Sequence, residues 1–213
     1  HLSESHVCLL NKFNVVDHHL LIITRDFEIQ ESWLTAADFA ALGSCMAVVN
    51  GLGFYNAGEP AGASQPHKHL QIVPLPMAIE VDIPIAPIIG AALEKQDGAI
   101  VAAPFPFQHG IARLTDVDWH SDTVGQILCD RYLALAQHLG LLDTPQPTTP
   151  TSPPYNLLVT RQWMIMVPRS RSSYEGIPVN SLGFAGALLA RDAKQLAHLK
   201  TLQPMTILAQ VGC

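Results

Sequence analysis

Two pairs of short apolar runs, one near each end of the chain, constrain the fold more than any other feature of the sequence. Residues 7–13 and 19–24 are rich in Val, Leu and Ile and are separated by residues 14–18, a pattern typical of two strands of an antiparallel hairpin. Residues 155–160 and 163–167 repeat the strand–turn–strand pattern. The sequence therefore predicts an α+β fold built on an antiparallel sheet with helices.

A helix is expected soon after the first hairpin. Thr35 is suited to the N-terminal cap, and Asp38 stands three residues later, where a capping-box partner belongs. Apolar residues then recur at spacings of three and four, which predicts a helix over residues 36–52 that ends at Gly51 and Gly53. Further strands are expected at 54–55, 67–75, 107–114 and 184–190, and further helices at 121–139 and 192–202.

Two segments with unusual composition interrupt this pattern. Residues 74–106 contain six prolines and little periodicity, so we expect an extended excursion there rather than a separate domain. Residues 144–154 are rich in Pro, Thr and Ser, and they predict a linker between two parts of the chain.

The low charge density excludes some classes of partner. Lys and Arg number 12 against 18 Asp and Glu, which gives a net charge of −6, and charged residues make up 14% of the 213 residues, against about 25% in typical globular chains. A nucleic-acid surface needs clustered Lys and Arg. The apolar residues 81–93, interrupted by Pro84 and Pro87, are too few for a membrane-spanning helix, which needs about 18. We therefore expect neither a nucleic-acid polymer nor a membrane as partner.

The cysteines and the start of the chain indicate a cytoplasmic protein. No CxxC pair is present, and scattered cysteines are typical of reduced thiols, with disulfides or a metal site as the alternatives. Residues 7–13 lack the basic lead and cleavage site of a signal peptide. Because the first residue is His1 rather than Met, we expect further residues to precede it. The four cysteines are Cys8, Cys45, Cys129 and Cys213.

The segment that carries chemistry is Gly62–Gln71, with the sequence GASQPHKHLQ. On a strand, alternate residues share one face, so His67, His69 and Gln71 are expected to project together, about 6.5–7 Å apart. Lys68 is expected to face the other way. Three polar side chains on one face make a poor core surface, which indicates a site.

The loop before these histidines is suited to phosphate. Its small residues leave backbone N–H groups unhindered, and Ser64 and Gln65 add a hydroxyl and an amide. Two chemistries fit the histidine pair: metal binding, and nucleophilic attack on phosphorus by a neutral imidazole. Among acidic residues, Glu59 in the loop is the candidate further ligand for a metal. The loop favours the nucleophile, and the plain alternative is a pair of core histidines held by hydrogen bonds.

Residues 62–71, with Asn56 ahead of them, resemble the signature of the ATP adenylyltransferases, the diadenosine tetraphosphate phosphorylases. This family belongs to the histidine-triad superfamily and is related to galactose-1-phosphate uridylyltransferase. One departure is Asp17, where the family has proline. The resemblance extends to residues 10–14, 19–24, 155–161, 167–170 and 180–186, and it covers most of the chain apart from the proline-rich middle.

The resemblance implies a histidine-triad-like antiparallel sheet in which two half-units form an intramolecular pseudo-dimer. Residues 1–143, with the excursion at 74–106, would be the N-terminal catalytic half. Residues 144–154 would be the linker, and residues 155–213 the C-terminal ATP adenylyltransferase half packed on the same fold.

The resemblance also implies roles for individual residues. His69 matches the histidine that attacks the α-phosphorus of diadenosine tetraphosphate to form an adenylyl-histidine, from which phosphate releases ADP. The His67 carbonyl would accept a hydrogen bond from Nδ1 of His69. Gln71 stands where histidine-triad hydrolases have a third histidine, and its amide would bind a phosphoryl oxygen. The positions matching nucleotide and phosphate contacts are Asn56, Ser64 and Gln65.

Some other basic residues are candidates for contacts to the phosphates. Lys12 is expected to steady the polyphosphate, unless it is a plain surface lysine. One arginine among Arg161, Arg169 and Arg171 would reach phosphates, although a solvated face is the alternative for each. The His18-His19 pair fits turn and strand packing.

We expect no tightly bound cofactor, Mg²⁺ arriving with the nucleotide, and a monomer or weak dimer. The alternative functions are a histidine-triad-like dinucleoside polyphosphate hydrolase, a non-catalytic nucleotide sensor and a metal-binding protein.

Overall fold

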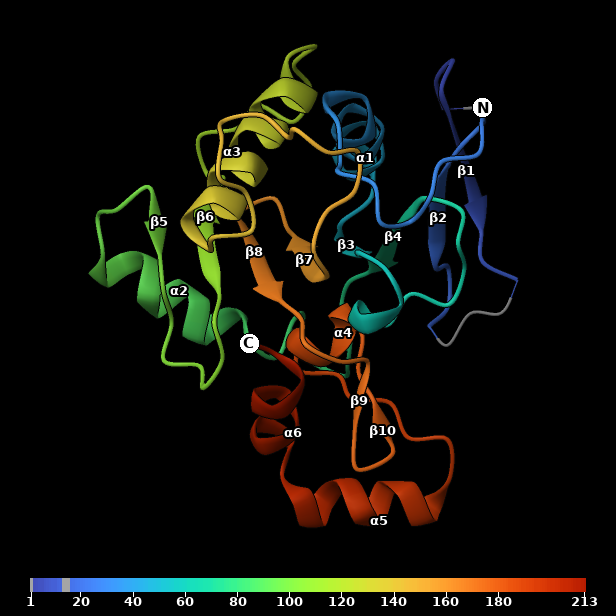
Figure 1. Ribbon diagram of the computed structural model, residues 1–213, viewed down its shortest axis with the longest axis vertical. Helices are drawn as coiled ribbons and strands as arrows, with labels where there is room; N and C mark the ends of the chain where they lie inside the picture. Colours follow the sequence, from blue (N-terminus) through green and yellow to red (C-terminus); the bar gives the residue numbers. More distant parts are fainter. Residues whose placement is uncertain (1, 13–15) are drawn as a thin grey trace.

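The computed structural model describes residues 2–12 and 16–213. Within these residues, eight strands form one sheet in the order β1-β2-β4-β3-β7-β8-β6-β5 (Figure 1). Every neighbouring pair is antiparallel. The strands are β1 (His6–Leu10), β2 (Leu20–Thr24), β3 (Gly51–Asn56), β4 (His69–Pro74), β5 (Ile100–Val101), β6 (Gly110–Arg113), β7 (Tyr155–Val159) and β8 (Trp163–Pro168), and a separate ribbon pairs β9 (Ser173–Tyr174) with β10 (Ile177–Pro178).

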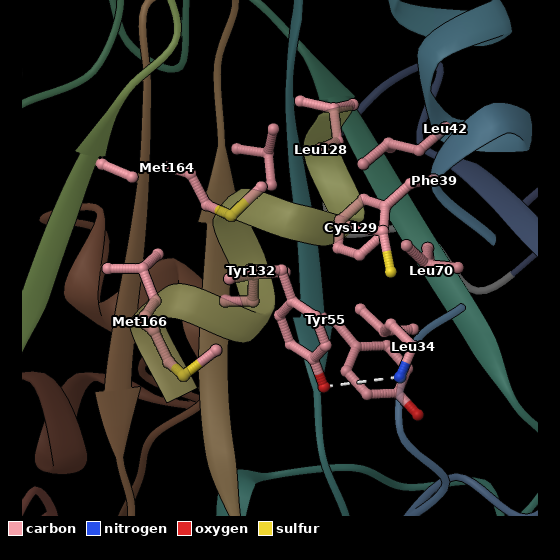
Figure 2. Close-up of a cluster of buried hydrophobic side chains, with 14 of the residues drawn as sticks. Leu34, Phe39, Leu42, Tyr55, Leu70, Leu128, Cys129, Tyr132, Met164 and Met166 are labelled. Carbon is pink, nitrogen blue, oxygen red and sulfur yellow. Dashed lines mark hydrogen bonds between the residues drawn. The ribbon is translucent and has the colours of Figure 1, made fainter. Parts of the chain in front are cut away.

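Helices cover both faces of the sheet (Figure 1). One face packs against α1 and α3, where Phe39 and Tyr132 lie among sheet side chains such as Leu70 (Figure 2). The opposite face packs against α2, α4 and α6, with Phe54 and Val73 in its core. The helices are α1 (Ala36–Val48), α2 (Ala86–Lys95), α3 (Val124–His138), α4 (Ser181–Phe184), α5 (Ala193–Leu202) and α6 (Pro204–Val211), with a 3-10 helix, η1, at Glu59–Ala61.

The chain contains two half-units with the same element order. The series β1-β2-α1-β3-β4 and the series β5-β6-α3-β7-β8 occupy matching positions on either side of the central β3–β7 pair. The predicted antiparallel α+β pseudo-dimer is therefore confirmed. The expected division at residues 144–154 does not coincide with the division of the sheet, because β6 pairs with β8. That linker joins α3 to β7 inside the second half-unit, and backbone contacts of residues 150–152 with residues 31–33 hold it against the segment before α1.

The first hairpin and the capping box are confirmed. β1 pairs with β2 from His6↔Thr24 to Leu10↔Leu20. Residue 13, the end of the predicted strand, and residues 14–15 of the predicted turn lie outside the described residues. The Thr35 hydroxyl accepts from the N–H of Asp38, and the Asp38 carboxylate accepts from the N–H of Thr35 at 2.7 Å.

The glycines expected to end α1 have another role. The helix ends at Val48, and Gly51 and Gly53 both lie in β3. A Cβ on Gly53 would stand 3.0 Å from a methyl carbon of Leu42 and 3.2 Å from the sulfur of Met46. Glycine in the strand thus lets α1 approach the sheet closely.

Two further expectations are wrong. Residues 74–106 are not simply extended, because they contain α2 and β5; Pro87 lies in the first turn of α2, where a missing N–H costs no helical hydrogen bond. Residues 184–190 are not a strand, because Phe184 ends α4 and Gly186 turns the chain with a φ of +98°. Among the described residues, no helix has the length and apolar character needed to cross a membrane.

Candidate active site

A cavity of about 370 Å³ lies where β3 ends and β4 begins, on the face of the sheet away from α1 and α3. It brings together five residues predicted for the site with four others. The predicted residues are Asn56, Ser64, Gln65, His69 and Gln71, and the others are Asn11, Leu21, Gly62 and Asn180.

His69 presents a neutral imidazole to this cavity. The side chain is buried, and its Nδ1 lies 2.8 Å from the carbonyl oxygen of His67. A carbonyl can only accept, so Nδ1 carries the proton and Nε2 carries the lone pair. Burial lowers the pKa of His69, and this outweighs the opposite effect of the His67 carbonyl. The hydrogen bond that the family resemblance implied is confirmed, and His69 is chemically suited to act as a nucleophile.

The side chain of His67 does not line the cavity, contrary to the expectation that it projects with His69. Its Nε2 lies 3.0 Å from the hydroxyl of Thr24 and 3.3 Å from the carbonyl of Asp26, and its ring lies 5.3 Å from that of Phe27. The reason is that β4 begins at His69, so the alternation of a strand does not extend back to His67. The residue serves His69 through its backbone carbonyl.

Gln71 follows His69 on the same face of β4 and lies beside a second buried histidine. Burial lowers the pKa of His19; a hydrogen bond with the Gln71 side chain acts in the opposite direction, and the nearby His69 lowers the pKa further. The ring of His19 also packs against Phe54, with centroids 5.8 Å apart. The prediction of strand packing for His19 is thus accurate, but no sequence pattern indicated that the residue borders Gln71.

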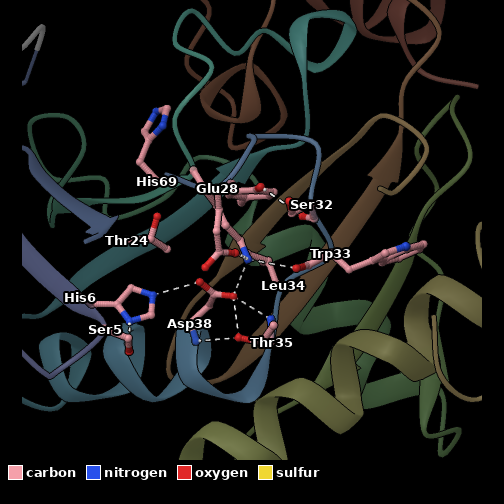
Figure 3. A network of polar contacts seen from close by, with 12 residues as sticks. Ser5, His6, Thr24, Glu28, Ser32, Trp33, Leu34, Thr35, Asp38 and His69 are labelled. Carbon is pink, nitrogen blue, oxygen red and sulfur yellow. Dashed lines mark hydrogen bonds and ion pairs between the residues drawn. The ribbon is translucent and has the colours of Figure 1, made fainter. Parts of the chain in front are cut away.

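Lys68 faces the opposite side of the sheet, as predicted, and bonds to Asp38 at the start of α1. Figure 3 shows the buried polar network around Asp38, which also includes His6 and Thr35. Its Nζ lies 2.8 Å from Asp38, 3.0 Å from Glu28 and 3.1 Å from the carbonyl of Trp33. Burial alone would raise the pKa of Asp38, but hydrogen bonds and charge from His6 and Lys68 lower it to about 2. This network anchors the residue immediately before His69 to α1.

Asn56 is held with one side of its amide turned toward the cavity. Its Oδ1 accepts hydrogen bonds from Nδ2 of Asn156 at 2.8 Å and from the N–H and the hydroxyl of Ser181 at 2.9 and 2.7 Å. These donors fix the orientation of the amide. Within the described part of the chain its Nδ2 donates no hydrogen bond, so this donor is available to a ligand.

The loop between β3 and β4 depends on glycine and on the segment before α4. Gly62 has a φ of +88°, and a Cβ there would lie 2.6 Å from the carbonyl oxygen of Val179, so only glycine fits. Asn180, beside it, caps α4 by accepting from the N–H of Leu182 at 3.0 Å. Sequence reasoning assigned no role to Asn180, although an asparagine before a short helix was the available signal.

Arg161 and Arg169 have structural partners, and none of the three arginines lines the cavity. Arg169 is buried and donates to the carbonyls of Ala61, Val179 and Val211, at 3.0 to 3.3 Å, so the expectation of a solvated face is wrong for it. Burial lowers the pKa of Arg169 to about 10. Arg161 donates to the carbonyls of Met46 and Ala47 at the end of α1, where a cation is favourable. Arg171 is exposed.

The donors of the cavity are therefore neutral. None of the described residues that line it is Lys or Arg, and Lys12, exposed beyond the end of β1, is not among them. Across residues 2–12 and 16–213, no group of three or more His, Cys, Asp or Glu side chains is placed to hold a metal ion. Amides, hydroxyls and backbone N–H groups can bind phosphoryl oxygens without a full positive charge.

Comparisons with known proteins agree with the division of the sheet. Residues 1–91 match the Ap4A phosphorylase N-terminal domain, and residues 103–213 match the ATP adenylyltransferase C-terminal domain. The first match ends within α2, which joins the two half-units, and the second match begins just after β5.

Two curated relatives come from Saccharomyces cerevisiae. Diadenosine 5',5'''-P1,P4-tetraphosphate phosphorylase 2 is 33% identical over 216 residues, which cover 90% of this chain and 64% of that protein. Protein APA1 is 24% identical over 206 residues, which cover 89% of this chain and 63% of that protein. The chain therefore spans slightly less than two thirds of the length of these relatives.

Crystal structures of yeast Ap4A phosphorylase Apa2 superpose on almost the whole chain. The complex with Ap4A has a TM-score of 0.80 and 27% identity, covering 99% of this chain and 74% of that one. The complex with AMP has the same TM-score and coverage, with 29% identity.

Proposed function

The chain belongs to the Ap4A phosphorylase and ATP adenylyltransferase family, and we propose that it is a nucleotidyltransferase that cleaves diadenosine tetraphosphate with phosphate to ADP and ATP, and that it catalyses the reverse reaction. The observation that carries the proposal is the state of His69. Its Nδ1–H is held by the His67 carbonyl at 2.8 Å, and its ring lines the cavity. The name of the yeast phosphorylase that is 33% identical supports the choice of substrate.

In the first step, Nε2 of His69 attacks the α-phosphorus of the dinucleotide. A P–N bond forms, the bond from phosphorus to the bridging oxygen breaks, and its electron pair leaves with ATP. The positive charge that develops on the imidazole is stabilised by the His67 carbonyl, which accepts from Nδ1. In the second step, a phosphate oxygen attacks the same phosphorus, the P–N bond breaks, and ADP leaves with His69 neutral again.

Gln71 suits a transferase better than a hydrolase. An amide cannot exchange a proton at neutral pH, but it can donate a hydrogen bond to a phosphoryl oxygen on which charge develops. The leaving group is a nucleotide whose terminal phosphate is a weak base, so this step needs no strong general acid. We assign Gln71 to stabilisation of the phosphoryl oxygens.

The remaining lining residues are assigned to substrate binding. Neutral donors line the cavity together with His69. They are Nδ2 of Asn56, the side chains of Ser64 and Gln65, and the amide of Asn180. We propose that Mg²⁺ enters with the polyphosphate and offsets its charge. Lys12, at the exposed end of β1, stays a prediction as a contact to the polyphosphate.

A product assay tests the reaction type. We expect diadenosine tetraphosphate to give ADP and ATP in the presence of phosphate. AMP and ATP, formed equally with and without phosphate, would indicate the hydrolase instead. Tight binding without turnover over hours would indicate a nucleotide sensor.

We infer the assembly state and the compartment from two further features. Pairing of β3 with β7 joins both half-units inside one chain, so we infer a monomer or weak dimer, which sedimentation velocity can test. Cys8, Cys45, Cys129 and Cys213 are free thiols, which favours a reducing compartment, the cytoplasm. Localisation of a tagged protein in its native cell tests this assignment.

A further inference from the structure

The ladder between β3 and β4 stops just before the cavity. The last backbone pair of these strands is Phe54↔Gln71, and two residues further on the same register would place Asn56 opposite His69. Instead, the side-chain amide of Gln30 lies between them. Its Oε1 accepts from the N–H of His69 at 2.9 Å, and its Nε2 donates to the carbonyl of Asn56 at 2.9 Å and to that of His69 at 3.3 Å.

Gln30 is itself fixed on all sides. The residue is 1% exposed. Its backbone N–H donates to the carbonyl of Pro66 at 2.8 Å, and its carbonyl accepts from the hydroxyl of Tyr55. The oxygen and the nitrogen of the side-chain amide are therefore both hydrogen-bonded, as are the backbone N–H and carbonyl. The side chain cannot shift without leaving buried polar groups unsatisfied.

We propose that Gln30 is a positioning residue for the adenylyl transfer assigned above, on which this inference rests. Its amide replaces the missing backbone pair and holds Asn56 and His69 apart, so that Nε2 of His69 and Nδ2 of Asn56 both face the cavity. Without it, the two strands are free to close or to drift. A displacement of about 1 Å at a reacting atom costs about 100-fold in rate.

A second buried glutamine provides a matched control. Gln195 is 9% exposed, its Nε2 donates to the carbonyl of Gly176 at 2.8 Å, and its Oε1 accepts from the N–H of Arg191 at 2.8 Å. It thus bridges two backbone groups as Gln30 does, but it does not line the His69 cavity. Gln30→Met and Gln195→Met each remove a side-chain amide that bridges two backbone groups.

The experiment compares single-turnover labelling with binding. Protein carrying each substitution is mixed with diadenosine tetraphosphate labelled at the α-phosphorus, the rate of covalent adenylylation is measured, and the Kd for AMP is measured separately. For Gln30→Met we expect the adenylylation rate to fall about 100-fold while the Kd for AMP rises by much less, because the other residues assigned to binding keep their places. For Gln195→Met we expect neither to change.

Two results would overturn the role of Gln30. One is an adenylylation rate for Gln30→Met equal to that of Gln195→Met; the other is a loss of AMP affinity as large as the loss of rate, which would make Gln30 part of the binding surface. If Gln30→Met fails to fold, Gln30→Asn replaces it with the same expected result, since the shorter amide cannot reach both strands. Absence of label on the unsubstituted protein would contradict the proposed function itself.

Discussion

Residues 67–69 and residues 107–109 build the same local arrangement around two buried histidines. Nδ1 of His69 lies 2.8 Å from the carbonyl of His67, and Nδ1 of His109 lies 2.8 Å from the carbonyl of Phe107. Burial lowers the pKa of both imidazoles. The difference lies in the other ring nitrogen, since Nε2 of His109 accepts from the N–H of Ala103 at 2.9 Å whereas His69 lines the cavity.

This difference shows what makes a histidine a candidate nucleophile in this chain. The tautomer and the depressed pKa are shared, so neither distinguishes a functional residue from a structural one. The surroundings of Nε2 do. A backbone N–H donates to the lone pair of His109 and stabilises the fold. The cavity lined by amide and hydroxyl donors leaves the lone pair of His69 available for the proposed attack on phosphorus.

The strongest test of this comparison is to remove each ring in turn. His69→Ala should lower turnover of diadenosine tetraphosphate by about 10⁴-fold or more, because the atom that forms the covalent bond is lost. His109→Ala should keep turnover near the unsubstituted value at temperatures where it is folded, and lower the free energy of unfolding by about 1–3 kcal/mol, because the N–H of Ala103 is left without a partner. Equal losses of turnover in the two variants would contradict the comparison.

The segment that carries His69 is anchored to α1 through the ion pair of Lys68 with Asp38. Lys68→Met leaves the carboxylate of Asp38 buried without its ammonium partner, 2.8 Å away in the unsubstituted protein. We expect the free energy of unfolding to fall by about 3–5 kcal/mol, as measured by urea denaturation. The double variant Lys68→Met/Asp38→Asn serves as the control, and it should recover part of the loss because the unpaired charge is gone. A single variant as stable as the original would show that the network does not anchor this segment.

A smaller loss of turnover is expected at His67, because only its backbone carbonyl contacts His69. His67→Ala keeps the carbonyl that accepts from Nδ1 of His69 and removes the side-chain hydrogen bond to Thr24. Turnover should therefore fall by less than about 10-fold, in line with the net value of one hydrogen bond. A loss comparable to that of His69→Ala would give the His67 side chain a direct role in the chemistry.

The smallest effect concerns pH. Because burial lowers the pKa of His69 below the ordinary 6.5, the adenylylation rate should stay level as the pH falls through 6.5 and decline only at lower pH, where the imidazole protonates. The free energy of unfolding should decrease as the pH drops below 6.5, because the unfolded chain takes up protons that His69 and His109 do not. An acid limb centred above 6.5 would contradict the assignment.

Local patterns predicted much of this structure. The capping box at Thr35, both hairpins and the pairing of His69 with Gln71 on one face follow from periodicity and short-range hydrogen bonding. The division of the sheet did not follow, because it depends on β6 pairing with β8 across more than fifty residues. Nothing near Gln30 in the sequence marks it, since its partners His69 and Asn56 are distant in the chain. Arg169 was expected on a solvated face because its partners Ala61 and Val211 are also distant in the chain.

The proposed function depends on transfer of the adenylyl group to Nε2 of His69. The most direct measurement is to mix the protein with diadenosine tetraphosphate in the absence of phosphate, stop the reaction in a single turnover, and locate the modification by mass spectrometry of peptides. We expect one AMP on His69 and none on His67 or His109, with the label released as ADP when phosphate is added. An unmodified His69 in a protein that nevertheless turns over the dinucleotide would contradict this transfer.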